Sequence, residues 1–141
     1  MLYQPPRLTR RSYPLSWFHL HLPSRQVSFG VRLYNTMAGF AEILIELLPT
    51  DKGGRRSPIC LSTDNATPYR PHFRVRSGNG EMLGVEFVDG PDEPVAPGGS
   101  TYATVRFVYE PEVCYDELVI GAEFDILEGD RVVGVGRVTR R

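Results

Sequence analysis

The sequence predicts an all-β fold, a closed antiparallel six-stranded β-barrel with a disordered N-terminal tail. Two observations support this prediction. From Phe40 onward, apolar and polar residues alternate with a period of two in one short segment after another, which is the pattern of half-buried strands. Clusters of Gly, Pro, Asn and Asp separate these segments, as expected of turns. Only residues 116–119 could form a helical turn, and a closed barrel gives every strand two neighbours.

The expected strands follow in order from Phe40 to Val138. The first ends near Pro49, and its apolar face holds Ala41, Ile43, Ile45 and Leu47. The second presents an apolar face of Pro71, Phe73 and Val75 and a polar face of Arg70, His72, Arg74 and Arg76. The apolar faces of the third and fourth contain Leu83, Val85, Phe87, Ala103, Val105, Phe107 and Tyr109. The last two strands, residues 119–127 and 131–138, form a hairpin through the turn Glu128-Gly129-Asp130.

The charge is divided unevenly along the chain of 141 residues. Residues 1–36 contain five arginines and no acidic residue, and we expect them to form a disordered tail, which could also lie upstream of a true start at Met37. An organellar transit peptide has a similar composition. The remaining 11 basic and 17 acidic residues give residues 37–141, the expected barrel domain, a net charge near −6. That balance argues against a dedicated nucleic-acid binder, whose affinity would come from a surface that neutralises phosphates.

Several classes of site lack their sequence signals. The single lysine, Lys52, is not part of a phosphate-binding loop, so we expect no GTP hydrolysis. Ser62, Asp64 and His72 could be imagined as a catalytic constellation, but their spacing does not fix the geometry. The two cysteines, Cys60 and Cys114, lack metal-ligand spacing and are expected to be buried thiols. We therefore expect no enzyme activity, cofactor, metal or small-molecule substrate.

The hydropathy of the sequence also predicts where the protein is located. No apolar run approaches the roughly 18 residues of a membrane-spanning helix. We expect a cytoplasmic protein that does not bind membranes.

Three motifs resemble one known family. They are Gly53-Gly54-Arg55-Arg56-Ser57-Pro58, then Tyr69-Arg70-Pro71-His72-Phe73, and the hairpin that begins at Glu128-Gly129-Asp130-Arg131. The C-terminal (third) β-barrel domain of the translation elongation factor Tu family has a Gly-Gly-Arg-His-Thr-Pro loop, a Tyr-Arg-Pro-Gln-Phe strand and a Gly-Gly-Arg-Thr-Val-Gly-Ala-Gly hairpin in the same order. The resemblance covers residues 40–138. It implies the same barrel, here without the GTPase domain that normally precedes it.

The resemblance also suggests binding residues. The family's Gly-Gly loop lies on the side of the barrel that meets the GTPase domain, and here Arg55 and Arg56 could pair with carboxylates or phosphates. Parts of the family domain contact tRNA. His72 stands in place of the family glutamine, and Gly129 is kept. Leu127, however, falls where the family has a tRNA-facing arginine.

We therefore expect a non-catalytic binding module that docks on a protein partner, either a GTPase-like domain or another translation factor. The alternative is weak tRNA or RNA binding through the polar face of the second strand. We define the basic stripe as the residues Arg70, His72, Arg74 and Arg76, which the alternation places on one strand face. A simple solvated face or an ordinary surface loop would produce these patterns too. The expected partner-binding residues are the stripe together with Gly53, Gly54, Arg55, Arg56 and Gly129.

Overall fold

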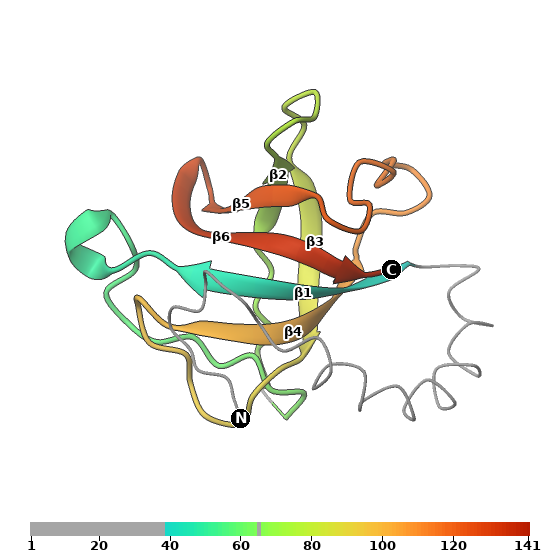
Figure 1. Cartoon of the computed structure of the whole chain (residues 1–141). Coiled ribbons are helices and arrows are strands. Elements are labelled where there is room, and N and C mark those ends of the chain that lie inside the picture. The colour runs from blue at the N-terminus through green and yellow to red at the C-terminus, as the bar shows by residue number, and fades with distance from the viewer. Residues whose placement is uncertain (1–38, 65) are drawn as a thin grey trace.

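The computed structural model of the chain describes residues 39–64 and 66–141. Its six strands are β1 (Phe40–Leu47), β2 (His72–Val75), β3 (Leu83–Asp89), β4 (Ser100–Phe107), β5 (Glu123–Glu128) and β6 (Arg131–Arg140), with one short 3₁₀ helix, η2 (Thr50–Lys52). They form a closed antiparallel barrel in the order β1-β4-β3-β2-β5-β6 (Figure 1). The predicted fold is confirmed. The predicted tail and the boundary at Met37 lie outside the described residues.

Alternating side chains build the core, as the period of two predicts. Every second residue of β1 is buried, and β2 follows the same pattern. Phe73 has no exposed surface, and its ring stacks on that of Phe124 with 4.0 Å between the ring centroids. The ring of Phe87 meets Phe73 edge-on at 6.1 Å. Burial of these rings removes a large apolar area from water, which is the main stabilising contribution to such a barrel.

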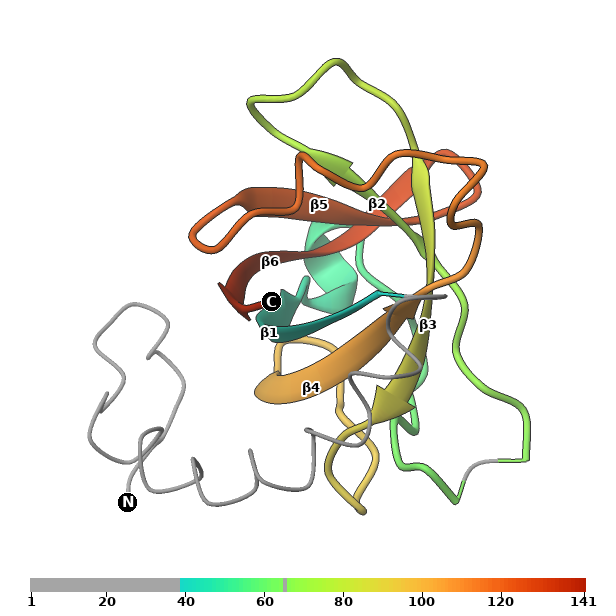
Figure 2. The same ribbon diagram turned by 90° about the vertical axis from the view of Figure 1, so that its right-hand side faces the viewer.

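Two long connections cross the ends of the barrel, because the strands that they join are not neighbours in the sheet. β1 is paired with β4 and β6, whereas β2 is paired with β3 and β5, so residues 48–71 must cross one end to join β1 to β2. β4 and β5 are not neighbours either, so residues 108–122 cross the other end. The two connections lie at opposite ends in Figure 1, and Figure 2 turns the end with residues 108–122 towards the viewer.

Three details differ from the sequence-based expectation. β4 ends at Phe107 and β5 begins at Glu123, so Tyr109 and Val119 belong to the connection between them. These two side chains are exposed because the alternation stops where the chain leaves the sheet. The expected helical turn at residues 116–119 is a non-helical turn, and the helical turn is η2 instead.

The cysteines also differ from the expectation. Both are free thiols, but Cys60 is only half-buried and Cys114 is exposed on the connection. They lie in loops, where burial depends on tertiary packing and not on strand periodicity.

Candidate functional site

The Gly53–Pro58 loop lies on the first crossing connection, at the end of the barrel where the β5–β6 hairpin turns. The backbone conformation and packing of the loop require both of its glycines. Gly53 has φ of +93°, which L side chains rarely adopt, and it follows η2 directly. Gly54 packs so tightly that a Cβ atom there would lie 2.0 Å from the carbonyl oxygen of Leu48. The Gly-Gly pair therefore shapes the loop itself.

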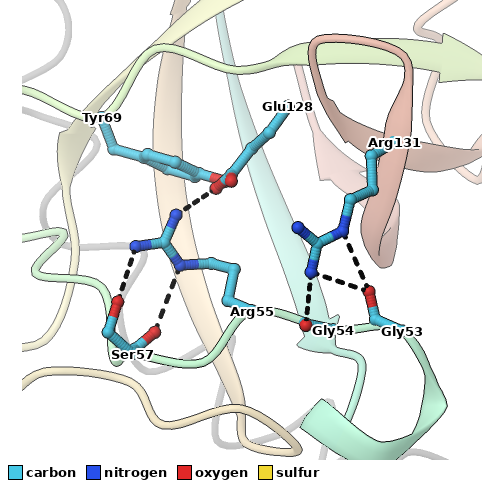
Figure 3. A network of polar contacts seen from close by, with 7 residues as sticks. All are labelled: Gly53, Gly54, Arg55, Ser57, Tyr69, Glu128 and Arg131. Atoms are coloured by element: carbon cyan, nitrogen blue, oxygen red, sulfur yellow. Dashed lines mark hydrogen bonds and ion pairs between the residues drawn. The ribbon is translucent and has the colours of Figure 1, made fainter.

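Arg131 fixes this glycine pair from the hairpin. Its guanidinium donates hydrogen bonds to the Gly53 carbonyl at 3.2 and 3.3 Å and to the Gly54 carbonyl at 2.7 Å (Figure 3). Both carbonyl oxygens are thus occupied from within the chain. The loop is held to the first residue of β6.

Arg55 points back onto the barrel, where it joins three other side chains. It forms an ion pair with Glu128 of β5, and its guanidinium also donates to the Ser57 carbonyl and hydroxyl oxygens, each at 3.2 Å. The Tyr69 hydroxyl donates to the same Glu128 carboxylate at 2.6 Å, and the Arg55 guanidinium lies 5.8 Å from the centre of the Tyr69 ring. Figure 3 shows this network. Arg55 thus anchors the loop, with its charge neutralised inside the chain.

The environment of Tyr69 fits a structural role. Burial raises the pKa of the Tyr69 hydroxyl far above its usual range, and the hydrogen bond to the Glu128 carboxylate raises it further. The phenol therefore stays protonated and acts as a donor to Glu128. It is not poised to exchange a proton near neutral pH.

Arg56 is the outward-facing arginine of the loop. Its side chain is exposed, and it makes no hydrogen bond or ion pair with any described residue. The carbonyls of Gly53 and Gly54 and the side chain of Arg55 are all engaged within the chain. Arg56 is the one loop arginine that can meet a partner without first breaking an internal contact.

The basic stripe faces outward from β2, but its charges are paired. Arg70 lies 3.5 Å from the carboxylate of Glu86 on β3. Arg74 and Arg76 lie 3.7 and 3.1 Å from the carboxylate of Asp125 on β5. The neighbouring strands therefore supply acidic side chains beside the arginines. The wall of the barrel is a mixed-charge surface at this place.

Glu86 sits between two arginines. Its side chain is 12% exposed, and it pairs with Arg106 of β4 as well as with Arg70. Hydrogen bonds from Arg106 lower the pKa of the Glu86 carboxyl, while burial opposes that shift and the positive charges of Arg106 and Arg70 add to it. The carboxylate is therefore ionised at neutral pH and holds β3 to β4.

The remaining predicted positions are divided between surface and core. His72 is half-buried on β2 and lies opposite Leu127 of β5 in the register. Leu127, the position that the resemblance aligns with a tRNA-facing arginine, has no exposed surface. Gly129 has φ of +66° in the two-residue hairpin turn, where it serves the turn geometry. Ser62 Oγ accepts a hydrogen bond from the Asp64 N–H at 3.1 Å, and no hydrogen bond joins it to His72 in residues 39–64 and 66–141.

Two further properties concern the described part of the chain. Its His, Cys, Asp and Glu side chains do not gather into any group of three that could hold a metal ion. None of its helices has the length and apolar character needed to cross a bilayer.

A scan against models of known protein families found no match for this chain.

Sequence reasoning missed the two residues that hold the loop from the hairpin, Glu128 and Arg131. In the sequence, Glu128 belongs to the predicted turn and Arg131 begins the predicted last strand, and nothing nearby indicates a contact with the loop. Their partners in the loop, Arg55 and Gly53, lie more than 70 positions earlier in the chain. Only the pairing of β5 with β6 under the first crossing connection brings them together, so no local pattern could identify them.

Proposed function

We propose that the barrel is a non-catalytic binding module that resembles the third domain of elongation factor Tu and docks on a GTPase-like or translation-linked protein partner. The Gly53–Pro58 loop would form the contact. The position of Arg56 is the observation that carries this proposal. Arg55 and Arg131 hold the backbone of the loop that carries Arg56, so little backbone entropy is lost on binding. A carboxylate of the partner would be a suitable acceptor.

The surroundings of β2 favour a protein partner over RNA. Glu86 and Asp125 lie beside the arginines of the basic stripe, and their negative charges reduce the attraction for a phosphate backbone. The buried Leu127 replaces the arginine that the resemblance would assign to tRNA. RNA binding through Arg70, Arg74 and Arg76 remains the alternative, since their side chains are 60, 38 and 50% exposed.

A binding measurement with two purified probes tests the proposal. The full chain is immobilised and offered the isolated GTPase domain of elongation factor Tu, in its GDP and GTP-analogue states, and then tRNA. We expect saturable binding of the GTPase domain that Arg56→Glu weakens. Arg70→Gln is the comparison variant, because it removes one exposed arginine charge on the wall of the barrel without placing a like charge beside Glu86. Binding of tRNA that is lost in the Arg70 variant and kept in the Arg56 variant would reverse the order of the two functions.

A pull-down with the full chain, with and without ribonuclease, extends the test to partners of other kinds. A translation factor captured after ribonuclease treatment would support the protein-binding function if Arg56→Glu abolishes its capture. Capture that depends on intact RNA would contradict it.

A further inference from the structure

The end of the barrel opposite the Gly53–Pro58 loop exposes apolar side chains. We define the end surface as Met82, Tyr109, Val119 and Ile120, which are the large apolar residues exposed in the described part of the chain. All four lie in the β2–β3 or β4–β5 connection, which the antiparallel order places at the same end (Figure 2). Val119 is 55% and Ile120 is 65% exposed. Val119 and Ile120 are consecutive in the chain and both exposed, so they offer apolar area to a contacting segment.

The β4–β5 connection at this end is acidic. Residues 108–122 contain no basic residue and four acidic ones, Glu110, Glu112, Asp116 and Glu117. Glu110 and Glu117 accept hydrogen bonds from backbone N–H groups, at 2.6 Å from Gly39 and 3.0 Å from Asn79. The side chains of Glu112 and Asp116 make no hydrogen bond or ion pair with any other residue that the structure describes. Their charges are available to a partner.

One arginine does reach this connection, but it is already engaged. The Arg141 guanidinium donates to the carbonyls of Tyr115 and Leu118 at 3.2 and 2.7 Å, and it lies 4.7 Å from the centre of the Phe107 ring. These contacts tie the C-terminus to the connection. They do not neutralise the two unpaired carboxylates.

Gly39, the first residue that the structure describes, lies at this end. The Gly39 N–H donates to Glu110, and the Gly39 carbonyl accepts a hydrogen bond from the Phe107 N–H at 2.9 Å. Residues 1–36 precede this residue in the sequence, so their attachment to the barrel is at this end. They carry five arginines and no acidic residue, and their densest apolar run is Trp17 to Leu22. Both their charge and their apolar residues complement the surface.

We propose that residues 1–36 bind the end surface of their own barrel, with the run from Trp17 to Leu22 against Val119 and Ile120 and arginines beside Glu112 and Asp116. The composition of this segment predicts disorder when it is alone, because it cannot bury enough apolar area by itself. The end surface supplies the missing apolar partner. A tether of about twenty residues keeps the segment at an effective concentration on the order of millimolar, so even weak contacts hold it.

The single tryptophan of the chain allows a direct test, because its fluorescence reports only on the segment. Acrylamide quenching of Trp17 is measured in the full-length protein, native and in urea. We expect native quenching to be several-fold weaker than in urea. The double variant Val119→Ser with Ile120→Ser should raise native quenching to the urea value without unfolding the barrel, since both side chains are exposed. Quenching that is equally strong in native protein and in urea would refute the proposal.

A matched pair of charge variants tests the electrostatic part. Glu112→Lys with Asp116→Lys should also raise the native quenching of Trp17 towards the urea value. Asp92→Lys with Glu93→Lys should leave it unchanged. The second pair makes the same change in net charge on exposed side chains of the β3–β4 loop, at the other end of the barrel. Equal effects of the two pairs would overturn the specific contact. Protection that increases with protein concentration would place the segment on another copy and would contradict binding within one chain.

This contact is independent of the proposed partner docking. The end surface and Arg56 lie at opposite ends of the barrel. Release of Trp17 in the variants above would leave capture of the GTPase domain unchanged, so failure of one proposal is distinguishable from failure of the other.

Discussion

Arg55 and Glu128 are 73 positions apart in the chain and form an ion pair that fastens the Gly53–Pro58 loop to β5. Tyr69 donates to the same carboxylate, so one acidic side chain holds two parts of the first crossing connection. The two consecutive arginines of the loop therefore have different roles. Arg55 positions the loop, and Arg56 faces solvent.

We expect the two arginines to differ in their effect on stability. Arg55→Ala should lower the free energy of unfolding by about 1 to 2 kcal/mol, because Glu128 and Tyr69 lose their cation in a partly buried site that water still reaches. Arg56→Ala should change it by less than about 0.5 kcal/mol, as is usual for an exposed side chain without partners. Urea unfolding of both variants provides the measurement. Equal effects would show that Arg55 does not anchor the loop.

Phe73 should be among the most sensitive core positions. Phe73→Ala removes a ring with no exposed surface that contacts Phe87 and Phe124, and it should cost about 3 to 5 kcal/mol. Arg56→Ala is the control, since this side chain is exposed, makes no hydrogen bond or ion pair with any described residue, and should change stability by less than about 0.5 kcal/mol. Chemical unfolding followed by circular dichroism gives both values. A Phe73 variant as stable as the control would contradict the packing of the core.

Glu86 should make stability depend on pH in the acidic range. Its folded-state pKa is lowered, so its ionised form stabilises the fold fully above the unfolded-state pKa of about 4.3. This contribution is lost as the pH falls from that value through the folded-state pKa. Glu86→Gln should be less stable at neutral pH and should show a shallower loss of stability on acidification. Parallel curves for variant and parent between neutral and acidic pH would disprove the role of the carboxylate.

RNA binding through the basic stripe would have a measurable salt dependence. If Arg70, Arg74 and Arg76 each contacted one phosphate, the log-log slope of affinity against salt would be about −2 to −3. We expect no tRNA binding with such a slope, because Glu86, Asp125 and Glu123 neutralise these arginines from neighbouring strands. Fluorescence anisotropy with labelled tRNA over a salt series measures it. Binding with that slope at physiological salt would favour the RNA function.

Reversal of Arg56 should be the most damaging single change for docking. Breaking a buried pair between an arginine and a partner carboxylate weakens the binding free energy of the complex by roughly 2 to 5 kcal/mol. Arg56→Glu should therefore weaken binding of the GTPase domain at least about 30-fold, with unchanged stability of the barrel. Interferometry with the purified domain measures the loss. Unchanged affinity would remove the loop from the interface.

The barrel could be predicted from the sequence because alternation reports directly on strand faces. Phe73 and Val75 are buried where the period of two places them. The same pattern failed at Tyr109 and Val119, because apolar residues continue beyond the ends of β4 and β5 into a connection that leaves the sheet. Periodicity records hydrophobicity but not where pairing stops.

The site was only partly accessible to sequence reasoning. The outward direction of the stripe followed from alternation, but the acidic partners of Arg70 and Arg74 lie on β3 and β5 and became neighbours only through the strand order. The inward turn of Arg55 likewise depends on Glu128, which topology brings under the loop. Long-range ion pairs of this kind leave no local signal in the sequence. The charges of one strand therefore do not predict the electrostatic potential of the folded surface.

Closure of the barrel also restricts how any partner can bind. A sheet with a free edge can recruit an extended peptide as an additional strand, and backbone hydrogen bonds then supply affinity with little regard for sequence. Each of the six strands in residues 39–64 and 66–141 already has a neighbour on both sides. Partners must therefore be recognised by side chains and by the connections at the two ends, so specificity rests on a few residues and a single substitution should be able to redirect it.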